Sequence, residues 1–162
     1  MAHSIERKGL PECDFDWLLR QTRLIAASYR RWTGKSLCRE DQPDEALARE
    51  LFAAPFVVAS AGTEADPILN YGNQKALALW EMDWAAFTKT PGRKTAEAME
   101  RGERAKFLDE VKKKGYIDNY CGVRISSTGR RFEIKQATVW NLMDSKGQYA
   151  GQAVTFSKTT AL

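Results

Sequence analysis

Few side chains in this sequence are suited to nucleophilic or metal chemistry. His3 is the only histidine among the 162 residues, which leaves almost no room for a Ser–His–Asp triad or a site with several histidine ligands. The three cysteines, Cys13, Cys38 and Cys121, are widely spaced and form no C-x-x-C pair, so neither a zinc site nor a disulfide framework fits them. We therefore expect no metal site, reduced thiols and a cytoplasmic protein.

Carboxylates could also carry chemistry, because acid–base catalysis needs a carboxyl group with a perturbed pKa. Glu64, Asp66 and Asp118 fall near the ends of predicted strands, but their spacing marks no catalytic pair. The chain also has no glycine-rich loop of the kind that holds phosphates. A binding module is therefore favoured, and a small enzyme that uses the same pocket is kept as the alternative.

Uncharged polar residues on two predicted strands are better candidates for a ligand site. In segment 131–143, alternation places six side chains on one face: Phe132, Ile134, Gln136, Thr138, Trp140 and Leu142. Gln152 falls in the last strand, on the same side as two apolar residues. A buried polar group without a partner costs roughly 1–3 kcal/mol, so an amide on an apolar face can be held there by a ligand. The predicted ligand-binding residues are Gln136, Thr138, Trp140 and Gln152.

Each of these candidates also has a structural interpretation. The two glutamines could bond to each other or to the backbone, or point outward if the predicted register is off by one residue. Trp140 could be a core anchor, since large aromatic side chains dominate core burial.

Composition and charge are those of an ordinary globular domain. Hydrophobic residues make up 43% and charged residues 28% of the chain, and no apolar run approaches the roughly 20 residues that cross a bilayer. The net charge of +4 is a small difference between 25 basic and 21 acidic residues. The densest basic run, Lys112–Lys114, closes a predicted helix, where cations are favourable. Nucleic-acid binding is therefore not favoured.

The N-terminal part of the chain predicts an amphipathic helix from Asp14, its N-cap, to Thr33, before Gly34. Six positions at spacings of three and four form its apolar stripe: Phe15, Leu18, Thr22, Ile25, Tyr29 and Trp32. The stripe is expected to pack on the domain's own sheet, and a homodimer contact through this N-terminal helix is the alternative.

The remaining elements predict an α+β domain. A short helix begins at Pro43, strands cover 56–60 and 68–71, and short helices and a longer one over 95–114 follow. Three further strands are predicted over 117–125, 131–143 and 148–157. Together they indicate a five-stranded antiparallel sheet with helices on one side, plus N-terminal helices. We divide the chain into an N-terminal helical extension, residues 1–44, and a domain over residues 45–162.

This order of elements resembles that of a PAS domain, and four sequence blocks sharpen the resemblance: 62–67 (GTEADP), 66–77 (DPILNYGNQKAL), 122–126 (GVRIS) and 139–142 (VWNL). They resemble the MEKHLA family, a PAS-like domain found alone in bacteria and algae and at the C-terminus of plant class III homeodomain–leucine zipper proteins. The resemblance covers residues 45–158 and is to the stand-alone type. Ala61 stands where members often carry histidine.

The resemblance implies a sensory or interaction module that binds a small molecule or a partner and signals through association. Haem is disfavoured, because the iron ligand in haem-binding PAS domains is usually a helical histidine and residues 4–162 contain none. Covalent flavin is disfavoured, because Cys121 lies on a predicted strand and not in an Asn-Cys-Arg-Phe helix motif. Non-covalent flavin is left open, and the ligand is unknown.

Overall fold

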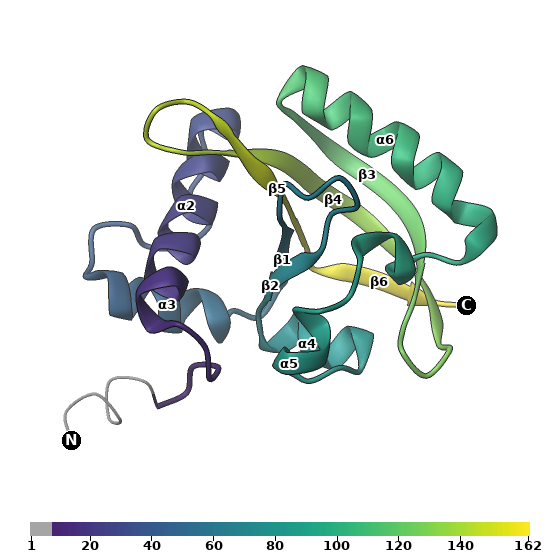
Figure 1. Ribbon diagram of the computed structural model, residues 1–162, viewed down its shortest axis with the longest axis horizontal. Helices are drawn as coiled ribbons and strands as arrows, with labels where there is room; N and C mark the ends of the chain where they lie inside the picture. Colours follow the sequence, from purple (N-terminus) through teal and green to yellow (C-terminus); the bar gives the residue numbers. More distant parts are fainter. Residues whose placement is uncertain (1–7) are drawn as a thin grey trace.

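An antiparallel sheet forms the centre of the molecule (Figure 1). The computed structural model describes residues 8–162, so His3 and the start of the predicted 1–44 extension lie outside the described residues. The strands are β1 (Val57–Ala61), β2 (Leu69–Gly72), β3 (Tyr116–Ile125), β4 (Arg131–Met143), β5 (Tyr149–Phe156) and β6 (Lys158–Ala161). Their order is β2-β1-β5-β4-β3, and the short β6, which the sequence patterns did not predict, pairs with the first half of β4.

The helices are α2 (Phe15–Thr33), α3 (Asp44–Phe52), α4 (Gln74–Trp80), α5 (Trp84–Phe87) and α6 (Arg101–Lys114), with short 3₁₀ turns η1 (Gly92–Thr95) and η2 (Ala98–Glu100). The helix predicted over 95–114 is therefore shorter and begins at Arg101. Met99 lies in the preceding turn and is 76% exposed. No helix within residues 8–162 combines the length and apolarity that a membrane span needs.

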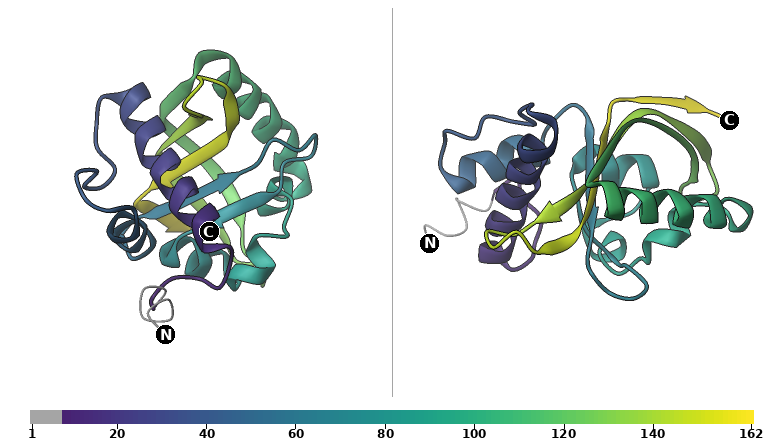
Figure 2. Two further views of the ribbon diagram at one scale, coloured as in Figure 1. Left: turned by 60° about the vertical axis from the view of Figure 1, so that its left-hand side comes forward. Right: turned by 90° about the horizontal axis from the view of Figure 1, so that it is seen from above.

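Helices cover both faces of the sheet, as Figure 2 shows from above. We call the face under α4, α5 and α6 the inner face and the face under α2 and α3 the outer face. The inner core contains Phe132, Ile134 and Phe156 from the sheet, and the outer core contains Trp140 and Leu142. The expected α+β fold is confirmed, with the N-terminal helices packed on the face that the other helices leave open.

The predicted limits of α2 are confirmed by its caps. The Asp14 carboxylate accepts a hydrogen bond from the Trp17 amide at 3.1 Å, and Gly34 ends the helix in the left-handed region at φ 74°. The apolar stripe packs on the chain's own sheet: Leu18 and Ile25 are buried. A homodimer through this helix, which stays a prediction, would have to use its other faces.

Two β-bulges change which side chains face inward. Asn119 in β3 and Gln136 in β4 have φ values of 56° and 53°, and the β3–β4 register shifts near both. A bulge inserts one unpaired residue, so every later side chain of the strand changes face. Ile134 therefore lies in the inner core and Trp140 in the outer core. The expectation that residues 132 to 142 share one face at alternate positions is wrong.

Asn73 holds the first half of the sheet to α4. Its side-chain oxygen accepts from the Ala76 amide, which caps α4, and from the Val58 amide in β1, both at 3.1 Å. Its amide nitrogen donates to the carbonyls of Leu51 and Phe56. The Asn73 side chain is fully buried, so Asn73 is a structural residue.

Candidate functional site

The structure does not bring the four predicted ligand-binding residues together. Gln136 is exposed at the bulge. Trp140 lies fully buried beneath α2, with its ring 4.9 Å from that of Tyr29, and Thr138 precedes it by two positions on the same stretch of strand. Only Gln152 lies against α6 on the inner face. Ligand binding by any of the four stays a prediction.

Gln152 and Asn141 form a pair of side-chain amides between the sheet and α6. They are direct cross-strand neighbours in β5 and β4. The Gln152 amide donates to the side-chain oxygen of Asn141 at 3.2 Å and to the carbonyl of Leu108 in α6 at 2.9 Å. The Asn141 amide donates to the carbonyl of Lys112, one turn further along α6, at 3.1 Å. We call these two residues and their bonds to α6 the amide junction.

The amide junction matters because α6 buries little apolar surface. Of the described residues of this helix, only Val111 is fully buried, although helices in globular proteins are usually held by a broad apolar face. Each hydrogen bond of the junction contributes about 1 kcal/mol. The attachment of α6 therefore depends on polar contacts that a polar ligand could replace.

The amide junction also contacts α2 across the sheet. The Trp32 indole of α2 donates to the backbone carbonyl of Asn141 at 2.9 Å, and the backbone N–H of Asn141 donates to the carbonyl of Gly115 at 2.8 Å. Gly115 joins α6 to β3 with φ 101°, and a Cβ there would lie 2.5 Å from the Trp32 ring. The end of α6, the amide junction and α2 are thus in direct contact.

The rest of the inner face is filled by aromatic rings. Trp80 of α4 lies 5.7 Å from Phe132 and 6.1 Å from both Phe87 and Phe156, measured between ring centroids. The buried Trp80 indole nitrogen has no hydrogen-bond acceptor among the described residues. A buried donor without a partner costs roughly 1–3 kcal/mol, so this cluster also offers a group that an acceptor would stabilise.

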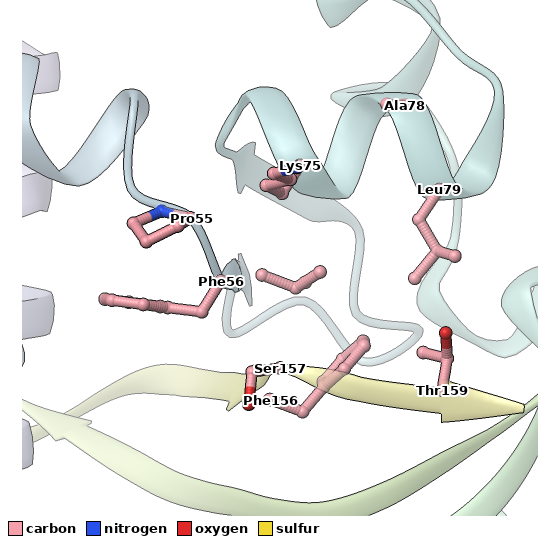
Figure 3. Close-up of a pocket in the computed structure, with 9 residues that line it drawn as sticks. Pro55, Phe56, Lys75, Ala78, Leu79, Phe156, Ser157 and Thr159 are labelled. Carbon is pink, nitrogen blue, oxygen red and sulfur yellow. The ribbon is translucent and has the colours of Figure 1, made fainter.

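Two pockets open elsewhere on the surface. One, of about 320 Å³, lies between α4 and the junction of β5 with β6, and its lining includes Phe56, Lys75, Leu79 and Phe156 (Figure 3). The other, of about 660 Å³, runs along α2 beside the β4–β5 turn. Among the described residues that line them, neither pocket includes a predicted ligand-binding residue.

The cysteines differ from one another in exposure. Cys121 lies on a strand, as predicted, and is exposed. Cys38 is the buried one, and burial, together with the nearby carboxylates of Glu50 and Glu40, raises the pKa of its thiol to about 11.

This difference predicts selective labelling by a thiol reagent at pH 8. The raised pKa keeps the Cys38 thiol protonated at that pH, and only the thiolate reacts. We expect Cys38 to react at least about 100-fold more slowly than an ordinary exposed cysteine, while Cys121 reacts at once. Intact-mass and peptide analysis over time would measure both rates, with the urea-unfolded chain as control. Equal rates in the native protein would contradict the prediction.

Asn141 is the site residue that sequence reasoning missed. Asparagine is depleted in strands, and here it follows the apolar residues Val139 and Trp140 in a strand interior. That anomaly was the available signal. The signal was hidden because unbroken alternation placed Asn141 on the face opposite to Gln136. The bulge at Gln136 instead turns Asn141 inward, beside Gln152.

The sequence matches known proteins over most of its length. The family model of the MEKHLA domain matches residues 19–161. The chain is 28% identical over 127 residues to the homeobox-leucine zipper protein ATHB-9 of Arabidopsis thaliana, and 28% identical over 126 residues to ATHB-14 of the same plant. Each match covers 75% of this chain but 15% of the relative, so the chain spans a small part of the relatives' length.

Solved structures of PAS and light-oxygen-voltage domains share the fold. A PAS domain from Colwellia psychrerythraea gives a TM-score of 0.60 at 9% identity, covering 71% of this chain and 92% of that one. The aureochrome1 light-oxygen-voltage domain gives 0.54 at 18% identity, covering 75% and 86%. The family match begins within α2, and the division at residue 44 stays a prediction. The expected resemblance is confirmed: this chain belongs to the MEKHLA domain family and has a PAS-like fold.

Proposed function

We propose that this chain is a sensory and interaction module of the PAS type. A small molecule or partner would bind at the inner face, change the bonds of the amide junction, and thereby change how the module associates. The supporting observation is the amide junction itself, which holds a weakly packed helix on one face and contacts α2 on the other.

The hydrogen bonds of the amide junction are weak enough for a ligand to change the conformation. Two or three bonds of about 1 kcal/mol each are comparable to the free-energy difference between two conformations of a responsive protein. A ligand that offers its own acceptor to Gln152 would compete with the Leu108 carbonyl and release that part of α6. Because Trp32 packs on Gly115 at the end of α6, the change would reach α2, where we propose the homodimer contact.

The space on the inner face limits which cofactor can be proposed. Non-covalent flavin stays a candidate, since the similar structures include one titled for a flavin analogue in a light-oxygen-voltage domain. The aromatic cluster around Trp80 occupies much of the space beside the sheet, so a bulky ring system would have to displace it. A smaller polar ligand fits the described contacts better.

The change Gln152→Leu tests this function without any ligand. Leucine keeps the approximate volume but removes both amide bonds, which together contribute roughly 1–3 kcal/mol. We expect amide hydrogen exchange in residues 104–114 to become about 10- to 100-fold faster and the sedimentation coefficient to shift. The matched change Gln148→Leu, at an exposed turn position, should alter neither. Faster exchange without a change in association would refute signalling through association.

A further inference from the structure

Two arginines on the inner side of the molecule form no ion pair with a carboxylate of the described residues, 8–162. Arg124 of β3 is 8% exposed, and its guanidinium donates to the Val123 carbonyl at 2.8 Å and to the Tyr120 hydroxyl at 3.0 Å. Arg104 of α6 is half-buried and forms no hydrogen bond or ion pair with any residue in the described part of the chain. We call these two side chains the arginine pair.

Within residues 8–162, no ion pair compensates the positive charge of the arginine pair. Burial, and next the charge of Arg124, lower the pKa of Arg104 to about 10, so the Arg104 guanidinium is still charged near neutral pH. Asp66 is the carboxylate that opposes this effect at Arg104, but it forms its ion pair with Arg93 at 3.0 Å. Buried charges in proteins are normally paired, and no carboxylate within residues 8–162 forms an ion pair with either arginine.

The surroundings of the arginine pair are closely packed. The Phe107 ring of α6 stacks on Tyr120 at 3.8 Å, and the Arg124 guanidinium lies 5.6 Å from the same Tyr120 ring. The Arg104 guanidinium lies against Gly92 in η1, where a Cβ would come within 2.7 Å of Nη2. The elements α6, β3 and η1 thus adjoin one another around the arginine pair.

We infer that the arginine pair binds the oxyanion of a small ligand, a carboxylate or a phosphate. Guanidinium groups match both in geometry, because their parallel N–H groups can donate two hydrogen bonds to one oxyanion. Arg104 lies one helical turn before Leu108, whose carbonyl accepts from Gln152. An anion on Arg104 would therefore act on α6 next to the amide junction. This consequence rests on the proposed function, whereas the binding does not.

Thermal unfolding and calorimetry with two defined anions test the inference. We expect sodium phosphate or sodium succinate at pH 7.5 to raise the Tm saturably, above sodium chloride of equal ionic strength. Phosphate alone would indicate a phosphorylated ligand, and succinate alone a carboxylate. Arg104→Gln should weaken binding at least tenfold, and Arg104→Lys, which keeps the charge but loses the planar group, should weaken it less.

Lys106→Gln is the matched control, since it removes one charge from an exposed position of the same helix. It should leave anion binding unchanged. If Lys106→Gln lost as much anion affinity as Arg104→Gln, binding would depend on the overall charge of the helix, and the inference would be overturned. The inference would also be overturned if phosphate and succinate raised the Tm no more than sodium chloride does. If no anion binds while Gln152→Leu still shifts association, the inference falls and the proposed function stands. If anions bind but leave the exchange of α6 unchanged, the site stands and its regulatory role falls.

Discussion

Replacing Gly151 by alanine is expected to lower the free energy of unfolding by about 3–5 kcal/mol. Gly151 has φ 119°, a conformation that residues with a side chain avoid, and an added Cβ would lie 2.2 Å from the Ala61 carbonyl oxygen. That oxygen belongs to the backbone of β1, which pairs with β5 here. It cannot rotate away as a side chain could, so the two strands must separate.

The position also controls the candidate site. Gly151 precedes Gln152, and the β4–β5 register shifts between Asn141 and Met143, opposite this part of β5. The irregularity that requires glycine therefore also sets the register in which Gln152 meets Asn141. We expect Gly151→Ala to disturb the amide junction as well as the stability of the sheet.

Urea unfolding followed by circular dichroism would measure the loss. Gly147→Ala is the matched control, because Gly147 also has a positive φ, 76°, but nothing lies within 4 Å of an added Cβ. The control should lose only about 1–2 kcal/mol, the cost of the left-handed conformation. If both variants lost the same amount, the contact with β1 would carry no energy and the prediction would be wrong.

The elements of this fold could be predicted because local residues determine them. Asp14 and Gly34 fix both ends of α2 through their side-chain and backbone preferences. Asn73 and Asp83 cap α4 and α5 in the same way. The apolar spacing of α2 predicted its buried stripe, and the succession of strands along the chain needed only the periodicity and the turns.

Of the amide junction, Gln152 was among the predicted residues, but Asn141 could not be predicted, because its place depends on where the strands break their alternation. Asn119 and Gln136 take positive φ values without being glycine, and neither lies in a sequence context that signals a bulge. One unpaired residue moved Asn141 to the inner face and left Trp140 on the outer face. Arg124 of β3 is buried although its side chain is charged. Long-range pairing decides such positions, and a single sequence does not display it.

Trp140→Ala is expected to lower the free energy of unfolding by about 3–5 kcal/mol. The Trp140 ring is fully buried, packs edge-on against Tyr29 and belongs to the outer core that holds α2 to the sheet. Its removal would leave a large cavity under α2. Denaturant unfolding would measure the loss, and a ligand-stacking role would instead predict lost binding with nearly unchanged stability.

Substitution by phenylalanine separates packing from hydrogen bonding at the same face. The Trp140 indole nitrogen is buried without an acceptor in the described structure. Trp140→Phe removes this unsatisfied donor, which offsets part of the free energy of unfolding that the smaller ring loses. Trp32→Phe removes an indole that does have an acceptor, the Asn141 carbonyl at 2.9 Å. We therefore expect Trp32→Phe, and not Trp140→Phe, to speed hydrogen exchange at the end of α6. Faster exchange in Trp140→Phe but not in Trp32→Phe would show that the Trp32 indole does not carry the contact between α2 and the amide junction.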